Sequence, residues 1–361
     1  MSGRFRVVDA GLREGRYNIA LDQAMLELHQ AGTIPDSIRF IHFLPVALVG
    51  RHQQLSTEVD LDYCRRHGIG VGRRITGGGA IYLDQGQLGW ELVFGRRSLP
   101  GSSLGDIARS ICEAAAAGLS RLGVDARFRP RNDIEVDGRK VSGTGGFFDG
   151  DSLIYQGTVL VDMDPEAMVG ALRVPQAKIA KRGLDSAAAR VVTLRELLGE
   201  QTPAIAEVEQ ALLAGFQEHL GFEFERGALT AAEESLAQDL YCSQIGRDDF
   251  VAEIDGPPAG GAVHVGVHAG AGGTITSYVR REGAAGRRLG QVLITGDFFV
   301  APPRLIYDLE SHLRGIDAHA AGAAIDAFFA ARPVGLATVT AADFRRSVEA
   351  ALAAPAAAPV P

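Results

Sequence analysis

Apolar residues in the first half of the chain follow helix-like and strand-like spacings in turn. Four of them recur at positions i, i+3, i+4 and i+7: Leu21, Ala24, Met25 and Leu28. This spacing predicts a helix over 18–30 with one buried face, and Gly32 is typical of its end. The same reasoning predicts helices over 61–67 and 104–122, and strands at 37–42, 47–50 and 90–94. An alternation of this kind favours an α/β fold.

Glycine accounts for 45 of the 361 residues, and a first cluster lies within residues 69–84. This segment, IGVGRRITGGGAIYLD, has apolar runs on both sides of three consecutive glycines. It predicts a strand, a tight glycine turn and a second strand.

Residues 134–141 predict a β-hairpin with a two-residue turn. The turn sequence Asp137-Gly138 is favoured in type I′ turns. A regular register would oppose three pairs: Ile134 with Val141, Glu135 with Lys140, and Asp133 with Ser142. One face of this hairpin is apolar and the other is polar, and a further strand is expected at 153–161.

The order of elements changes in the second half of the chain. A basic loop at 178–190 is followed by a predicted helix over 204–220. Beyond residue 250, strands come first and helices follow: 263–268, 274–281, 291–294, then 303–314, 318–330 and 341–352. This order predicts a small α+β domain. Polar and acidic residues collect at 221–249, which is therefore expected to be a linker.

Charge and hydropathy exclude several classes of protein. Lys and Arg number 36 against 44 Asp and Glu, and the net charge of −8 argues against general binding of nucleic acid or anionic membranes. The apolar stretch 40–49 contains His42 and Pro45 and is far shorter than the ~20 residues of a membrane span. No signal peptide is recognised, so a cytoplasmic protein is expected.

The three cysteines, Cys64, Cys112 and Cys242, are widely spaced and contain no CxxC motif. They predict neither a disulfide framework nor a structural zinc site.

The glycine run has two interpretations. Three glycines let the backbone approach a ligand and present N–H groups to a phosphate or carboxylate, and Arg74 has the geometry to bind a phosphate with two hydrogen bonds. The alternative is a flexible hairpin with no ligand. The run is neither a Walker loop nor a dinucleotide-binding GxGxxG motif.

Lys140 likewise has two interpretations. It forms either a cross-strand ion pair with Glu135 or a fixed cation beside the oxygen-bearing side chains of Asn132, Asp133 and Ser142. Mg²⁺ in phosphate-binding sites takes one or two carboxylates together with phosphate oxygens, so the second interpretation points to a nucleotide site.

Three sequence blocks resemble the signature of the lipoate protein ligase family in order and spacing: RRITGGGAIYLD at 73–84, RNDIEVDGRKVSG at 131–143 and QGTVLVDMD at 156–164. Weaker similarities lie at 17–22, 50–53, 178–194 and 289–299. The resemblance implies an α/β (α+β) fold with the mixed sheet of biotin and lipoate ligases, related to class II synthetases. It also implies a catalytic domain over 1–243, a C-terminal accessory domain over 250–352 and a loose Ala/Pro tail over 353–361.

The reaction implied by this resemblance has two steps. ATP with Mg²⁺ converts the carboxylate of lipoate to lipoyl-AMP, and a lysine of a lipoyl-carrier protein then takes the lipoyl group. A carboxylate is a poor electrophile and a free lysine is mostly protonated at neutral pH, so activation must come from the acyl side. The implied partners are lipoate and the carrier protein, with no nucleic acid and no membrane.

The resemblance also assigns roles to residues. Lys140 is the catalytic cation that neutralises the carboxylate and the α-phosphate together, and Asn132 and Asp133 hold the triphosphate or Mg²⁺, with Asp133 as the metal ligand. The other residues implied to bind ATP or lipoyl-AMP are Arg74, Gly77, Gly78, Gly79, Ala80, Ile81, Tyr82, Ser142, Gly143, Gly157, Thr158 and Lys181.

Three positions depart from the family pattern. Leu83 and Gln156 stand where a His is common, and Gly145-Gly146 replaces bulkier residues. Gln156 can form hydrogen bonds but cannot titrate near neutral pH as His does. These departures concern the choice of acyl chain and acceptor more than the adenylation chemistry.

Two other functions fit the same family. An ATP-independent octanoyl or lipoyl transferase works through a cysteine thioester, but the expected positions at 129–133 and 165–176 contain no Cys. A non-catalytic protein that binds lipoyl-AMP or the carrier would lack the catalytic cation, whereas Lys140 is present. Biotin ligases carry a GRGRxGR-type loop in place of RRITGGG.

Overall fold

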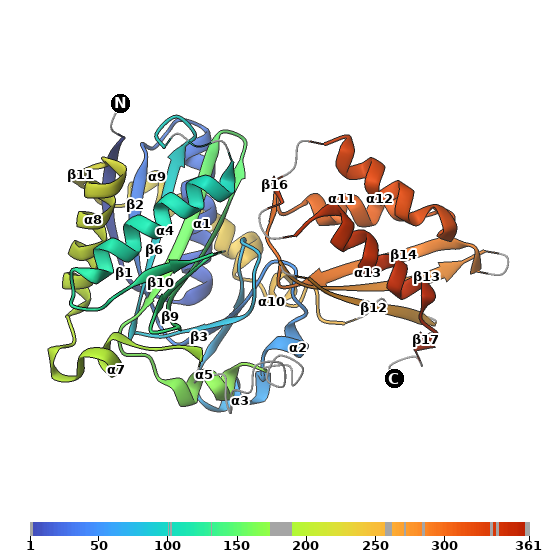
Figure 1. The fold of residues 1–361 in the computed structure, drawn as a ribbon, viewed down its shortest axis with the longest axis horizontal. Coiled ribbons are helices and arrows are strands. Elements are labelled where there is room, and N and C mark those ends of the chain that lie inside the picture. Colours follow the sequence, from blue (N-terminus) through green and yellow to red (C-terminus); the bar gives the residue numbers. More distant parts are fainter. Residues whose placement is uncertain are drawn as a thin grey trace. The chain divides into compact units, whose positions relative to one another are not determined.

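The computed structural model describes residues 3–99, 101, 103–130, 132–173, 190–256, 262–270, 272–283, 286–332, 335–336 and 339–357. It separates into two compact units (Figure 1). The first contains Met1–Val49, Glu58–Ile75 and Ala80–Val251, and the second contains Gly50–Thr57, Thr76–Gly79 and Ala252–Pro361. Two short segments of the first 80 residues therefore belong to the C-terminal unit.

An eight-stranded mixed sheet forms the centre of the first unit. Its strands, in spatial order, are β11 (Glu223–Arg226), β1 (Arg4–Arg13), β2 (Ser37–Phe43), β6 (Gln87–Gly95), β10 (Ser152–Leu160), β9 (Arg139–Asp149), β8 (Asp133–Val136) and β7 (Arg127–Arg129). Strand β1 runs parallel to β11 and β2, and the remaining neighbours are antiparallel. The predicted α/β class with a mixed sheet is confirmed.

Helices cover both faces of this sheet because successive strand residues point to opposite sides. Trp90 of β6 belongs to the apolar core and packs edge-on against Phe216 of α8 (Ile205–Leu220), beside α4 (Leu104–Ser120). The next residue, Glu91, points to the other face, where α1 (Gly15–Gln30) supplies Asp22 to the same polar network. Helix α9 (Ala231–Leu240) packs beside α1.

The glycine-rich segment does not form a hairpin. Its flanking strands β4 (Gly70–Arg73) and β5 (Ile81–Leu83) were both predicted, but β3 (Val46–Val49) lies between them in a three-stranded sheet. Strand β3 is parallel to β4 and antiparallel to β5. The glycines therefore link the two outer strands of a small sheet, which the local sequence gives no means of predicting.

The hairpin β8–β9 has the predicted turn but not the predicted register. Asp137 (φ 51°) and Gly138 (φ 76°) are both left-handed, as a type I′ turn requires. Glu135 opposes Lys140 as expected, whereas Ile134 opposes Ser142 and Asp133 opposes Gly143. The register shifts between Ile134 and Glu135, which makes Val141 an extra residue in β9, a β-bulge.

The second unit is the expected small α+β domain. Its main sheet has the order β14 (Arg288–Gly296), β13 (Gly273–Glu282), β12 (Val263–Gly270) and β17 (Ala356–Ala357). Helices α11 (Leu305–Leu313), α12 (Ala321–Ala330) and α13 (Ala341–Ala353) share an apolar core with that sheet. A short pair, β15 (Val300–Ala301) and β16 (Gly335–Leu336), completes the unit.

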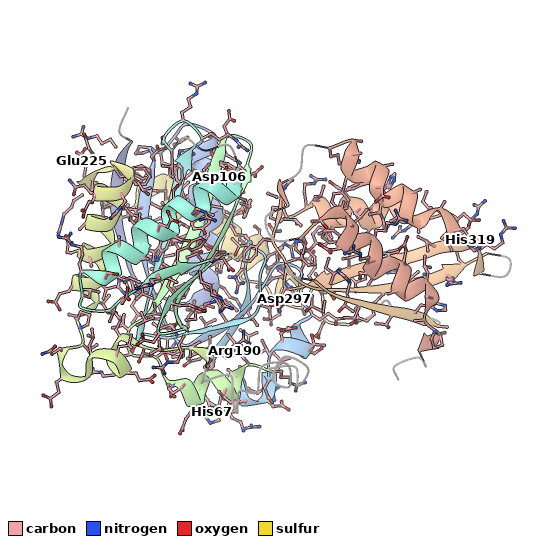
Figure 2. All side chains as sticks on the ribbon, in the orientation of Figure 1. His67, Asp106, Arg190, Glu225, Asp297 and His319 are labelled. Atoms are coloured by element: carbon pink, nitrogen blue, oxygen red, sulfur yellow. The ribbon has the colours of Figure 1, made fainter. Side chains whose placement is uncertain are left out.

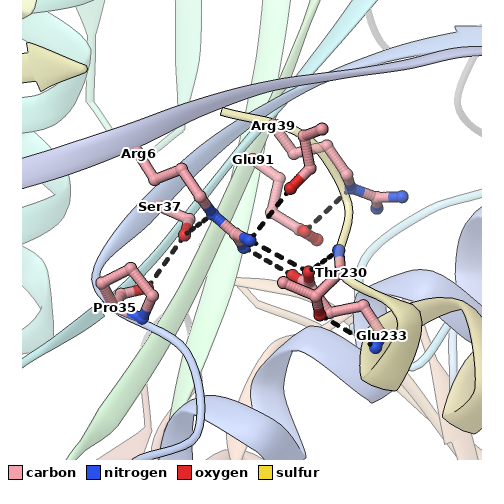
Figure 3. Close-up of polar contacts among 8 residues, drawn as sticks. Arg6, Pro35, Ser37, Arg39, Glu91, Thr230 and Glu233 are labelled. Carbon is pink, nitrogen blue, oxygen red and sulfur yellow. Dashed lines mark hydrogen bonds and ion pairs between the residues drawn. The ribbon is translucent and has the colours of Figure 1, made fainter. Parts of the chain in front are cut away.

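The segment 221–249 is not a linker. It contains β11, α9 and a π-helical turn, η3 (Tyr241–Ile245). One of its acidic residues is fully buried: Glu233 forms an ion pair with Arg6 of β1 (Figure 3). The neighbouring Glu234 is partly exposed and pairs with Arg13. The expectation of a linker was wrong because the partners of these acidic side chains lie about 220 positions away in the sequence.

The remaining short elements connect these layers. They are α2 (Leu55–Glu58), α3 (Leu61–Arg66), α5 (Pro165–Ala171), α7 (Leu194–Leu198), η2 (Gly199–Gln201), α10 (Asp248–Val251) and η5 (Ala318–Ala320).

Candidate active site

Lys140 and Asp133 form an ion pair on the hairpin β8–β9. Nζ of Lys140 lies 2.7 Å from Oδ1 of Asp133, and each side chain is about one third exposed, at 36% and 28%. Glu135, the expected partner of Lys140, pairs instead with Arg129 of β7. The bulge at Val141 offers the reason for this change of partner. It disrupts the regular ladder beside Lys140, so the lysine side chain reaches Asp133 although its backbone opposes Glu135.

Gly143 makes room for the lysine side chain. A Cβ atom at Gly143 would lie 2.5 Å from Nζ and 2.6 Å from Cε of Lys140. The lysine therefore lies flat over the backbone of its own strand, with its ammonium at the face that also carries Asp133.

The backbone of Lys140 is held from the other side by residues 191–192. Lys140 forms an isolated parallel bridge with Val191, and its carbonyl accepts a hydrogen bond of 2.9 Å from the N–H of Val192. The basic loop predicted at 178–190 thus ends directly on the lysine hairpin. Lys181 lies outside the described residues.

Asn132 is fixed by Thr144. Its Nδ2 donates to the carbonyl of Thr144 (2.7 Å), and its own carbonyl accepts from the Thr144 N–H (2.8 Å). Asn132 and Asp133 are adjacent in sequence and offer one amide oxygen and one carboxylate. Such a pair fits Mg²⁺ bound mainly by phosphate oxygens. Among the described residues, no group of three or more His, Cys, Asp or Glu side chains can hold a metal ion by itself.

Cys112 lies behind this hairpin. Its Sγ is 3.2 Å from Oγ1 of Thr144 and 3.3 Å from the Tyr155 hydroxyl, and it is fully buried. Since Thr144 alternates with Gly143 along β9, the thiol lies on the face of the sheet opposite Lys140. Burial raises the pKa values of both Cys112 and Tyr155.

Arg74 is buried immediately after β4. It donates from Nη1 to the carbonyl of Leu48 (3.2 Å), and burial lowers its pKa to about 10 despite the attraction of Asp22. It remains a cation at neutral pH. Tyr82 of β5 is also buried, and its pKa is raised by burial and by Asp84.

The glycine loop itself packs within the second unit. The N–H of Gly78 donates to the carbonyl of Phe298 (3.0 Å), and a Cβ at Gly77 would lie 2.2 Å from that same oxygen. Asp297, labelled in Figure 2, lies next to Gly79 and accepts the Thr274 N–H. At least one N–H expected to face a ligand is thus used to hold the loop, and the glycines are needed for close backbone packing. Ala80 and Ile81 return to the first unit.

The remaining predicted residues lie along the middle of the large sheet. Gly157 of β10 allows the buried Trp90 ring to pack against its backbone, since a Cβ there would lie 2.2 Å from the ring. Thr158 follows on the opposite face. The hydroxyl of Ser142 is buried, and the described part of the chain offers it no hydrogen-bond partner.

A row of three polar residues on the lysine face, two of them fully buried, was not predicted, although Gln156 by itself stood out as a departure from the family pattern. Arg39, Glu91 and Gln156 oppose one another across β2, β6 and β10. Nε of Arg39 lies 3.2 Å from Glu91, Nε2 of Gln156 donates to Glu91 (2.7 Å), and Arg39 also pairs with Asp22. The available signal was a charged residue in the middle of two otherwise apolar strands, which implies a buried partner.

The chain belongs to the lipoyl protein ligase A/B family. A family model for the "lipoyl protein ligase A/B catalytic domain" matches residues 14–217, more than half of the chain. The protein is therefore an enzyme of the lipoate ligase and transferase family.

The relatives of this chain include octanoyltransferases and lipoate protein ligases. "Octanoyltransferase LipM" of Symbiobacterium thermophilum is 32% identical over 273 residues, covering 69% of this chain and 98% of LipM. The bi-partite lipoate protein ligase of Thermoplasma acidophilum, solved in a study with its E2 lipoyl domain, has a TM-score of 0.62 at 29% identity and covers 72% of this chain and 100% of that one.

The fold extends to more distant proteins. The structure of P. falciparum LipL1 in complex with lipoate has a TM-score of 0.71 at 17% identity, covering 92% of this chain and 95% of LipL1.

Proposed function

We propose that this enzyme is an ATP-dependent lipoate protein ligase. It activates lipoate as lipoyl-AMP and transfers the lipoyl group to a lysine of a lipoyl-carrier protein. The observation that carries this proposal is the Lys140 ammonium, held by Asp133 over the open backbone of Gly143.

Adenylation brings the lipoate carboxylate and the α-phosphate of ATP together. A fixed cation beside them reduces the repulsion between these two anions. A carboxylate oxygen of lipoate bonds to the α-phosphorus of ATP, and the bond to pyrophosphate breaks. An ammonium 4 Å from such an anion contributes on the order of 4 kcal/mol at an effective dielectric constant near 20. Removal of a donor of this kind typically costs a factor of about 10² to 10³ in rate.

Transfer to the carrier then needs no protein nucleophile. The neutral amine of the carrier lysine attacks the acyl carbon of lipoyl-AMP, the amide bond forms, and AMP leaves with the bond electrons. Asp133 and Asn132 are the residues that would hold Mg²⁺, which would neutralise phosphate charge when bound.

The competing function is an octanoyltransferase, favoured by the similarity to LipM. That reaction requires a cysteine thiolate reached by the acyl donor. Burial raises the pKa of Cys64 to about 11 and also raises that of Cys112, and both side chains are buried. Cys242 is exposed, but it lies on η3 beside Gln238, far in sequence from the lysine hairpin. Neither of these two buried thiols has the low pKa typical of a nucleophilic cysteine.

The carrier protein and lipoate are the proposed partners. The described helices include none that is long and apolar enough to cross a membrane. A cytoplasmic site of action remains the proposal made from the sequence.

An intact-mass assay of an apo lipoyl domain tests the proposal. The wild-type enzyme is incubated with lipoate, ATP and Mg²⁺, and in parallel with octanoyl-carrier protein without ATP. The expected result is an ATP-dependent lipoyl adduct whose formation falls about 10² to 10³-fold in Lys140→Ala. The matched control is Arg139→Ala. Arg139 is the neighbouring cation on the same hairpin, and it pairs with Glu196 of α7, so this variant should remain active.

A cysteine-free variant separates the two functions. Cys64→Ala, Cys112→Ala and Cys242→Ser combined should leave the ATP-dependent adduct intact. An adduct that forms only from the octanoyl carrier, and disappears in this variant, would establish the transferase instead.

A further inference from the structure

The row of polar residues Arg39, Glu91 and Gln156 ends on the face that carries Lys140. Gln156 of β10 opposes Gly145 of β9, and two residues along β9 lies Gly143, over which the lysine side chain is placed. Residues two apart on a strand share a face, so Gly143 and Gly145 form a floor without side chains between Lys140 and Gln156. Strand spacing and rise place Gly143 and Gln156 about 8 Å apart.

Burial decreases along the row toward this floor. Arg39 and Glu91 are fully buried, whereas Gln156 is partly exposed. Gln156 is thus the only member of the row that a molecule lying on the glycine floor can touch.

The orientation of the Gln156 amide is fixed from behind. Its Nε2 donates to Oε2 of Glu91 (2.7 Å), and Oε1 of Glu91 is in turn held by Nε of Arg39. A carboxylate accepts only from the NH₂ group, so the amide cannot flip without losing this bond. The carbonyl Oε1 is therefore turned away from the row, and within the described residues nothing donates a hydrogen bond to it.

A fixed carbonyl oxygen beside an acyl chain discriminates between chains. The distal methylene groups of octanoate would cover this oxygen without offering a partner, which has a desolvation cost. The distal half of lipoate carries polarisable sulfur, and its reduced form carries S–H groups that are weak donors.

We propose that Gln156, positioned by Glu91, makes this enzyme select sulfur-bearing acyl chains over saturated ones of the same length. The proposal rests on the proposed function, in which Lys140 neutralises the carboxylate of the acyl substrate. Gln156 is the residue that touches the chain, and Glu91 acts through it as a positioning residue.

Equilibrium binding and adenylate formation with lipoate and octanoate test this. The wild-type enzyme should bind lipoate about ten-fold more tightly than octanoate, and Gln156→Leu should bring the two dissociation constants within about two-fold, mainly by tighter binding of octanoate. Gln23→Leu is the matched control: Gln23 also donates to a glutamate, Glu27 (2.6 Å), but on helix α1, and its loss should leave the ratio unchanged.

The role of Glu91 is tested by Glu91→Gln alone and together with Gln156→Leu. The single change should reduce selectivity, and adding it to Gln156→Leu should change the ratio no further. Melting temperatures show which variants fold, and Gln156→Met replaces Gln156→Leu if the latter is unstable.

The outcomes separate this inference from the proposed function. Selectivity that survives in Gln156→Leu and Gln156→Met, or a wild-type enzyme that does not discriminate, overturns the inference. Gln156-dependent selectivity in binding without any acyl-AMP synthesis supports the inference and overturns the ligase assignment.

Discussion

The position of the Lys140 ammonium depends on one residue with no side chain. Any β-carbon at Gly143 would displace Nζ from above the strand and from its contact with Asp133. The position of this candidate catalytic cation thus depends on the absence of a side chain at Gly143, the residue that follows Ser142. With a side chain at position 143, Lys140 would form at most a surface ion pair elsewhere, and such pairs contribute little to stability.

A single carboxyl group in the second unit should make stability depend on pH. Glu310 of α11 accepts the N–H of Ile294 (2.7 Å), and burial, with a contribution from Glu253, raises its pKa to about 7. Glu253 is itself paired with Arg51. Between the ordinary pKa near 4.5 and 7, the folded state keeps a proton that the unfolded chain releases. Rising pH therefore favours unfolding across this window, by at most about 3 kcal/mol.

Replacement of this carboxyl group by an amide should remove the effect. Glu310→Gln keeps an oxygen for the Ile294 N–H, so its unfolding midpoint in urea should change less than that of the wild type between pH 5 and pH 8. Glu349→Gln, at an exposed ion pair with Arg345, is the control. Parallel pH curves for wild type and Glu310→Gln would contradict the assignment.

At the scale of elements, the hairpin β8–β9 joins a well-defined turn to an irregular register. The turn needs two left-handed residues, and Asp137-Gly138 supplies them. The bulge at Val141 then lets Val141, Ile134 and Ser142 all be buried while Asp133 and Lys140 meet on the other face. A regular hairpin would have paired Asp133 with Ser142.

The turn should be the most sensitive part of this hairpin. Gly138→Ala places a β-carbon at φ 76°, which costs roughly 1 to 2 kcal/mol. Urea unfolding should show a loss of that size, with a smaller loss of adenylation than Lys140→Ala produces. Gly105→Ala in the first turn of α4, where a β-carbon meets only Ser103 Oγ at 3.6 Å, should be neutral or stabilising by up to about 1 kcal/mol. Equal losses of unfolding free energy in Gly138→Ala and Gly105→Ala would contradict this account.

At the scale of the whole molecule, the chain crosses between its two units several times. Residues 50–57 and 76–79 hold backbone hydrogen bonds to the C-terminal part: Leu55 to Ile254 (2.9 Å), Gly296 to His52 (3.0 Å) and Gly78 to Phe298 (3.0 Å). The first unit keeps Val251, whose carbonyl accepts the buried Arg73 guanidinium (2.8 Å). A chain that ends at residue 243, the end of the catalytic domain implied by the family resemblance, would lack that partner, so residue 251 is the better end point.

A chain ending at residue 251 should fold its large sheet but lose order in two loops. Amide hydrogen exchange should become fast at 50–57 and 76–79, while Thr144, bonded to Asn132 within the first unit, stays protected. Unchanged protection of the glycine loop would show that it is held without the second unit.

The elements themselves were largely readable from sequence. The periodic helices α1, α4 and α8, the central strands of both units and the Asp-Gly turn follow from local spacing and turn chemistry, which act over a few residues. Strands β1, β7 and β11 of the large sheet were not predicted. Helix α9 was not predicted, because its buried Glu233 meets its partner Arg6 only in the folded chain.

The sequence by itself determined the family, the mixed α/β class, the lysine hairpin and its turn, since these depend on residue identity and short-range spacing. Tertiary structure alone decided three things: the partner of Lys140, the central position of β3 between the glycine-linked strands, and the row Arg39–Glu91–Gln156. Each depends on register between strands distant in sequence. A register is fixed by which faces become buried together, and no local pattern records it.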